Sequence, residues 1–269
     1  VKFSYFVVTD AAVSLLVSTY FEGKVELSGF PEIGNTYFFI DVKKLRTSIK
    51  DISSIPLYPF IDGKKIPIPS TLMKLGAIKY KGNFTGFFND VVAFGKISTN
   101  LGNVSSDILI KQPKKTNDFF LSGRFSTDNF RVGAFLDPSY KIGNANMDVN
   151  IKTYFENYKF VNSDIKGKIS YVDINRYQYN NMSFDGTITP KSFDGNVSIK
   201  DQNLDLDFAG KCDFSQKLPI FDFNAHVGHL NFHRLNILNG DSIADISCSF
   251  KTKLTGNNIG NMNGYIRVD

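Results

Sequence analysis

Alternation of apolar and polar residues runs through long stretches of this chain, and it limits the possible folds more than any other feature. From residue 204 onward, Leu206 and Phe208 occupy one parity, whereas Asp205, Asp207 and Asp213 occupy the other. Successive side chains of a β-strand point to opposite faces, so such a segment has one apolar face and one solvated face. The pattern indicates antiparallel strands, because strands of parallel sheets are apolar on both faces.

The same alternation recurs near residues 145–151, 204–214, 221–227 and 246–254. We take the apolar parity of these stretches as the candidate lining of a groove, choosing it for its hydrophobicity. The set comprises Ala145, Met147, Val149, Ile151, Leu204, Leu206, Phe208, Cys212, Phe214, Phe221, Phe223, Ala225, Val227, Ile246, Cys248, Phe250 and Leu254.

Helical signals are confined to a proline-rich insertion, residues 49–76. Short helical turns are expected at its two ends, the first near Ile49 and the second after Pro69. The prolines between them suit an irregular segment rather than a strand. We therefore expect an all-β chain in which residues 1–269 form a single repetitive segment of a longer protein, interrupted only by this insertion.

Glycine recurs within the alternating stretches, usually followed by a polar residue and then an apolar one. The closest copies begin at Gly23, Gly95, Gly123, Gly167 and Gly210. Glycine inside a strand often marks a bend or a close approach of two backbones. Glycine at a similar place in strand after strand would let the sheet curl, and repeats of this kind are typical of elongated folds. We expect a long, curved antiparallel sheet.

The apolar face of such a sheet has to be covered. A second sheet would cover it in a sandwich, and the sheet would cover itself in a closed barrel. The remaining possibility is an open groove in which an apolar ligand lies. The alternation alone leaves all three open.

Charge and motifs exclude several classes of function. The chain of 269 residues carries a formal charge of +5, but its densest basic stretch is only the short run 111–115. A nucleic-acid-binding protein concentrates its charge on one patch or helix, so we expect no nucleic-acid partner. No nucleophile elbow, phosphate-binding loop or zinc-protease motif is present. We therefore expect neither enzymatic activity nor a cofactor.

The histidines and cysteines are the remaining candidates for chemistry. His226, His229 and His233 have a spacing that would suit a metal on a helix. On a continuous strand His226 and His229 would face opposite sides, and only a turn near Gly228 could bring them together, so we expect no metal site. Cys212 and Cys248 are expected to be unpaired thiols that behave as small hydrophobic residues.

Several segments together carry a resemblance to a known family. They are YFEGKVELSGFPEI at 20–33, LGAIKYKGNFTG at 75–86, YQYNNMSFDGTI at 177–188, DQNLDLDF at 201–208 and LPIFDF at 218–223. In these segments and in their order, the chain resembles the repeated β-segments of TamB proteins (translocation and assembly module) of the Bacteroidota type. TamB proteins are related to the AsmA-like family.

The resemblance implies a location in the periplasm, in a protein anchored to the inner membrane outside this segment and reaching the outer membrane. It implies a curled β-taco sheet whose hydrophobic groove binds acyl chains and conducts phospholipid between the two membranes. It also implies an outer-membrane barrel partner of the TamA type. With that partner, an alternative function is a scaffold for outer-membrane protein assembly by strand pairing. A surface or glycan-binding β-repeat protein is a second alternative, although the chain has no tryptophan for a sugar platform.

Overall fold

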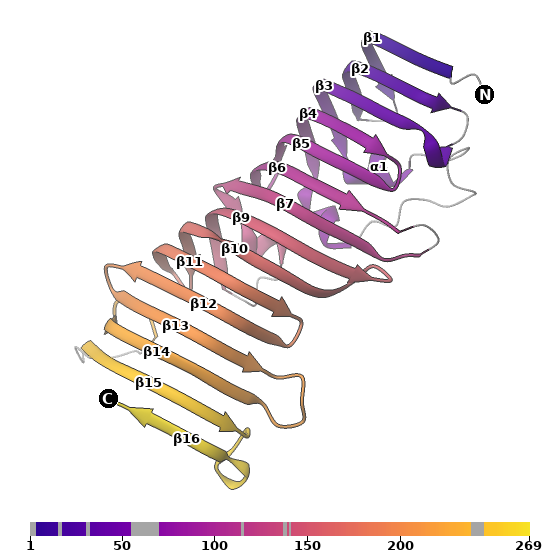
Figure 1. The fold of residues 1–269 in the computed structure, drawn as a ribbon. Helices are drawn as coiled ribbons and strands as arrows, with labels where there is room; N and C mark the ends of the chain where they lie inside the picture. Colours follow the sequence, from indigo (N-terminus) through magenta and orange to yellow (C-terminus); the bar gives the residue numbers. More distant parts are fainter. Residues whose placement is uncertain are drawn as a thin grey trace. The chain divides into compact units, whose positions relative to one another are not determined.

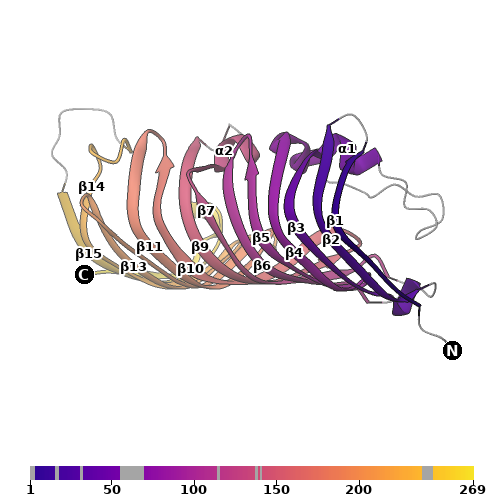
Figure 2. The ribbon, with the colours of Figure 1, turned by 90° about the horizontal axis from the view of Figure 1, so that it is seen from above.

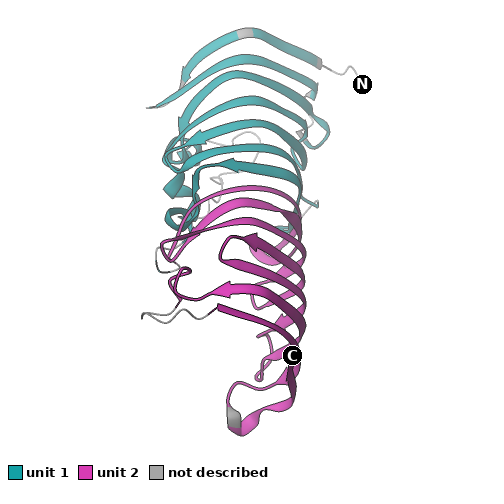
Figure 3. Ribbon diagram, turned by 90° about the vertical axis from the view of Figure 1, so that its left-hand side faces the viewer, with its two compact units in different colours: residues 1–140 teal, residues 141–269 magenta. Residues whose placement is uncertain are grey.

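The computed structural model describes residues 4–15, 18–30, 33–54, 70–113, 116–136, 139, 141–237 and 245–269. These residues are mostly β-strand, and the paired strands are antiparallel (Figure 1). The all-β, open antiparallel architecture expected from the sequence is confirmed. Contacts group the chain into two compact units, Val1–Tyr140 and Lys141–Asp269 (Figure 3), and each is described by itself.

The first unit is a meander in which seven strands pair one after another along the chain, and a two-residue strand follows them off this path. Its strands are β1 (Ser4–Leu15), β2 (Thr19–Phe30), β3 (Tyr37–Ser48), β4 (Ala77–Phe87), β5 (Asp90–Thr99), β6 (Gly102–Lys111) and β7 (Phe119–Asp128), followed by the short β8 (Phe130–Arg131). A 3-10 turn, η1 (Ile33–Asn35), precedes β3. The strands of this unit bend along their length (Figure 2), so its sheet is curved.

Both ends of the insertion are helical, as the sequence predicts. They are α1 (Ile49–Ser54) and the 3-10 helix η2 (Ser70–Leu75), and residues 55–69 lie outside the described part of the chain. A further turn, α2 (Val132–Phe135), was not expected. It contacts η2, where Lys74 Nζ donates hydrogen bonds of 3.0 and 2.5 Å to two backbone carbonyls at the end of α2. Among the described residues, no helix has the length and apolar character needed to cross a membrane.

The second unit is also a meander, in a single layer. Its strands are β9 (Ile142–Glu156), β10 (Lys159–Ile174), β11 (Tyr177–Thr189), β12 (Ser192–Asp201), β13 (Leu204–Asp213), β14 (Ile220–Asn231), β15 (Asp245–Thr255) and β16 (Asn263–Val268), with the turn η4 (Ile259–Asn261) before β16. Within the described residues of this unit, each strand pairs only with its neighbours along the chain. No second sheet made from these residues packs on either face.

Two tight turns set the register of the longest hairpins in this unit. Asn157 and Tyr158 join β9 to β10, and Asn175 and Arg176 join β10 to β11. All four residues have positive φ, between 48° and 68°. Two consecutive residues in this conformation make a type I′ turn, whose twist matches that of the strands it connects. Asparagine at the first position of each turn tolerates this conformation better than most residues.

Asp213 at the end of β13 is largely buried, although its place on the polar parity led us to expect a solvated carboxylate. Its side chain is 12% exposed. Ser215 in the following turn donates a backbone hydrogen bond of 2.8 Å to Oδ1, and Lys211 Nζ lies 3.0 Å from Oδ2. Hydrogen bonds from the hydroxyl and the backbone N–H of Ser215, and then the ion pair with Lys211, lower the pKa of Asp213 to about 2. The turn that follows β13 therefore supplies hydrogen bonds to this carboxylate.

The low pKa of Asp213 predicts a loss of stability in acid. Because the folded-state pKa lies below the value of about 3.9 for an unfolded chain, this stabilisation is complete above pH 4 and is lost as the pH falls toward 2. Denaturant unfolding between pH 5 and 2.5 should therefore show a shallower pH dependence for Asp213→Asn than for the original chain. The control Asp222→Asn, on the adjacent strand, should keep the original slope. Parallel profiles for Asp213→Asn and the original chain would contradict this assignment.

Candidate functional site

The apolar residues selected from the sequence share one face of the second unit. Pairing among β13, β14 and β15 places residues of the three strands in common rows. The rows are Leu204–Leu230–Ile246, Leu206–Val227–Cys248, Phe208–Ala225–Phe250, Gly210–Phe223–Thr252 and Cys212–Phe221–Leu254. Each row therefore continues the same face across three strands.

The candidate residues of β9 belong to this same face. Ala145, Met147, Val149 and Ile151 lie opposite Val172, Ile169, Gly167 and Ile165 of β10, respectively. The register of the intervening strands then connects β9 to β13. Phe184 lies opposite both Gly167 and Val197, and Val197 lies opposite Phe208. The apolar residues of each strand from β9 to β15 therefore lie in rows with those of the next strand, on one face of the sheet.

Burial distinguishes this face from the polar one. Ala145 is 0% exposed and Val149 is 4% exposed, although the sheet is a single layer. In one layer a side chain is shielded mainly by neighbours on its own face, and neighbouring side chains converge on the inside of a bend. The burial of Ala145 and Val149 therefore shows that side chains of the apolar face cover one another.

Aromatic rings form a strip across the middle of this face. The ring centroids of Phe193 and Phe208 are 6.1 Å apart, and those of Phe208 and Phe223 are 5.1 Å apart. These contacts connect β12, β13 and β14. The three rings are only half-buried, so each pairs with its neighbours at a distance typical of aromatic contacts and still offers apolar surface.

One end of the face is covered by the chain itself. Leu235, in the turn after β14, is 1% exposed and packs with Ile199 and Leu204. Leu206 lies at the margin of the same cluster. Leu204 therefore belongs to a small hydrophobic core rather than to the open part of the face. The other candidate residues of β13 lie outside this cluster.

The remaining candidate residues lie at the rim or in separate rows. Phe214 follows the end of β13 and is 53% exposed, with its ring centroid 5.5 Å from that of Phe221. Ile246 is also exposed. Cys212 and Cys248 are free thiols on the apolar face, in different rows. Partial burial raises the pKa of the Cys212 thiol, as expected for a thiol that packs as a hydrophobic residue.

The histidines depart from the expectation drawn from a continuous strand. A β-bulge at Gly228 shifts the parity, so His226 lies opposite Asp207 and His229 lies opposite Asp205. Both histidines therefore lie on the polar face, and the prediction that they face opposite sides is wrong. In the parts of the chain that the structure describes, no group of three or more metal-binding side chains is placed to hold an ion.

Sequence analysis missed the apolar residues of β10, β11 and β12. Those that share the face are Ile165, Ile169, Val172, Met182, Phe184, Phe193, Val197 and Ile199. Their alternation was visible, but glycines interrupt it and register shifts break its parity. One shift lies between Ile169 and Tyr171, and Asn181 in β11 has a positive φ of 52°.

The first unit contains a comparable apolar face that the candidate set also omitted. Val42 and Tyr80 are 2% and 6% exposed. The Tyr80 hydroxyl donates hydrogen bonds to the carbonyl oxygens of Phe94 (3.0 Å) and Asn83 (3.1 Å), and burial raises the pKa of Tyr80 to about 12. The hydroxyl is thus satisfied by backbone groups, and the ring contributes apolar surface.

Comparison with known proteins identifies no relative. No protein-family model, no curated protein and no solved structure matches this chain.

Proposed function

We propose that the apolar face of the second unit binds fatty acyl chains, and that the protein conducts phospholipid between the inner and outer membranes. The observation that carries this proposal is the continuous register of apolar side chains from β9 to β15 in a single layer. A ligand with a long apolar body suits such a face better than a compact ligand.

The side chains that line the face keep exposed apolar surface. This favours a bound apolar ligand over a packed internal core. Phe223, Phe250 and Leu254 lie in different rows and are each half-buried. Burying their remaining surface would contribute about 25 cal/mol per Å² of apolar area, or roughly 0.8 kcal/mol per methylene of the ligand. Because these contacts are not directional, an acyl chain could slide along the face over small barriers. The head group would stay in water at the mouth of the groove.

The cellular setting proposed here is the periplasm, on the strength of the resemblance to TamB segments. An anchor outside this segment would hold the protein in the inner membrane, and a TamA-type barrel would be its partner at the outer membrane. In this role the chain performs no chemistry and needs no cofactor.

The proposal predicts that a crosslinker captures lipid from the apolar face of β13 and not from its polar face. A photoreactive phenylalanine analogue at Phe208 should capture phospholipid on illumination in cells, because this position lies in the aromatic strip. The same analogue at Asp207, the adjacent residue on the polar face, should capture little or none. Mass spectrometry of the crosslinked protein measures both. Equal capture at the two positions, or none at either, would overturn the proposal.

A second candidate function, pairing with strands of another protein, is favoured by one observation. Within the described residues β16 pairs only with β15, and all six of its side chains are exposed. An edge strand with unpaired N–H and C=O groups is a template for β-augmentation. Capture of polypeptide by the same photoreactive probe at Ile266 on β16, without lipid capture at Phe208, would favour this function.

A further inference from the structure

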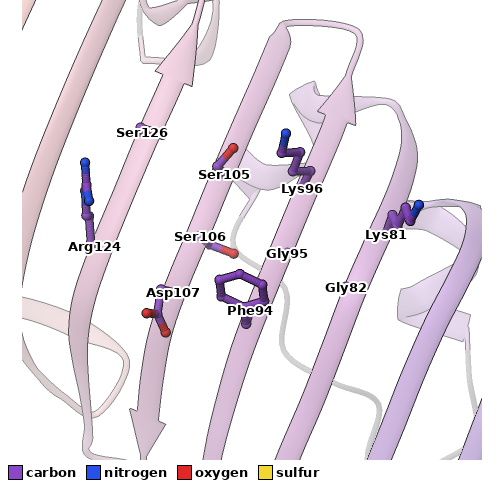
Figure 4. Close-up of a pocket in the computed structure, with 10 residues that line it drawn as sticks. All are labelled: Lys81, Gly82, Phe94, Gly95, Lys96, Ser105, Ser106, Asp107, Arg124 and Ser126. Carbon is purple, nitrogen blue, oxygen red and sulfur yellow. The ribbon is translucent and has the colours of Figure 1, made fainter.

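The first unit carries an open cavity of about 670 Å³ on β4, β5, β6 and β7 (Figure 4). Charged side chains from all four strands line it, among them Lys81, Lys96, Asp107 and Arg124, and Phe94 adds an aromatic ring. This volume lies within the range of about 300–1,000 Å³ typical of small-molecule sites. The cavity belongs to a different unit from the apolar face assigned to acyl chains, so its function can be argued independently.

Strand register brings these groups together on one face. Lys81 lies directly opposite Lys96, which lies opposite Ser105 on the next strand. In the adjacent row, Phe94 lies opposite Asp107, which lies opposite Arg124. Lys81 follows the buried Tyr80, so its side chain is on the other face of the sheet from the apolar Tyr80 ring.

The pair Lys81 and Lys96 is unfavourable without an anion. Like charges directly opposite each other on neighbouring strands destabilise a sheet. By contrast, Lys166 in the second unit has an acidic partner, Asp185, at 2.7 Å. In the described part of the chain, neither Lys81 nor Lys96 has a carboxylate within ion-pair distance. A bound dianion between the two ammonium groups would remove the repulsion and add charge-assisted hydrogen bonds.

The other lining groups indicate which chemical groups the ligand carries besides its anionic group. Phe94 is 55% exposed and offers a flat apolar surface. Asp107 is exposed in the adjacent row and can accept hydrogen bonds from hydroxyl groups, and Ser105 can donate or accept them. A ligand that matches the set has an anionic group, several hydroxyls and an apolar face. We propose that this cavity binds a phosphorylated sugar, with phosphate between Lys81 and Lys96 and the sugar ring against Phe94.

Calorimetric titration of the full chain with glucose 6-phosphate, glucose and inorganic phosphate tests this proposal. Glucose 6-phosphate should bind most tightly, and its affinity should fall at least about tenfold in Lys96→Gln, because a hydrogen bond to a charged group is lost. The control Lys251→Gln removes the same charge from an exposed site in the second unit and should leave the affinity unchanged. Circular dichroism checks that both variants are folded.

A second variant separates recognition of the sugar from recognition of the anion. Phe94→Ala should weaken binding of glucose 6-phosphate and leave the affinity for inorganic phosphate unchanged. If inorganic phosphate binds as tightly as the sugar phosphate and Phe94→Ala has no effect, the site recognises only an anion and the proposal fails. It fails also if none of the three compounds binds. Binding to phosphatidic acid vesicles that depends on Lys96, without sugar phosphate binding, would overturn it in favour of a membrane surface.

Discussion

Replacement of Gly210 by valine is expected to destroy the sheet around β13. Gly210 has a φ of +141°, a conformation that residues with a side chain rarely adopt. A Cβ atom at this position would lie 2.3 Å from the carbonyl oxygen of Asp222 and 2.5 Å from the Cα atom of Phe223. Both are backbone atoms of β14, so they can move only if the hydrogen bonds between β13 and β14 are broken. The cost should exceed about 4 kcal/mol, in the range reserved for severe structural defects.

Limited proteolysis and far-UV circular dichroism of the full chain measure this loss. Gly210→Val should expose β12 to β14 to cleavage under conditions in which the original chain resists it. The matched control is Ala209→Val, because Ala209 is the preceding residue of the same strand and its side chain is exposed. Valine favours strands, so this control should remain as stable as the original chain. Wild-type resistance in Gly210→Val would show that the backbone approach is not required.

Gly210 also belongs to a row of aligned glycines. The register places Gly186, Gly195 and Gly210 in one row across β11, β12 and β13. The sequence repeat predicted that glycines would occur at similar places in successive strands, and in this part of the sheet they are aligned. What the repeat could not provide is the register, which depends on turn geometry and on the exact length of each hairpin.

The sequence could predict which candidate residues share a face, because side chains alternate between the two faces of a strand. Phe208, Ala225 and Phe250 were selected from separate stretches, and they lie in one row. No knowledge of strand order was needed, since alternation assigns each residue to a face by itself. The same logic failed at His229, because a bulge adds one residue and reverses the parity after it.

Features that depend on turns could not be predicted from the alternation. Leu235 covers one end of the apolar face from an irregular segment, and Asp213 accepts a hydrogen bond from Ser215 in the turn after its strand. The cavity beside Lys81 and Lys96 requires that the hairpin of β4 and β5 places these lysines opposite each other. Each of these contacts joins residues whose proximity depends on the path of a turn, and single-strand patterns carry no information about that path.

Introduction of a carboxylate at Phe208 is expected to abolish most binding of acyl chains. The Phe208 ring is the centre of the aromatic strip, in contact with Phe193 and Phe223. Phe208 is half-buried, so losing the ring removes part of the about 1.5–3 kcal/mol that full burial of such a side chain contributes, and placing a charge beside a hydrocarbon chain adds to that cost. Because about 1.4 kcal/mol corresponds to a factor of ten, Phe208→Asp should lower the affinity for a fluorescent fatty acid by at least about tenfold.

The matched control for this prediction is Ala209→Asp, which introduces the same group one residue further along β13, on the polar face. It should retain both the bound lipid and the affinity for fatty acid, because its carboxylate points into water. Lipid extraction and mass spectrometry of the two purified variants, after circular dichroism has confirmed that each is folded, give the decisive comparison. Equal lipid content in the two folded variants would mean that acyl chains do not lie along the aromatic strip. Loss of lipid from Phe208→Asp alone would place them on the apolar parity, since the variants differ only in which face of β13 carries the charge.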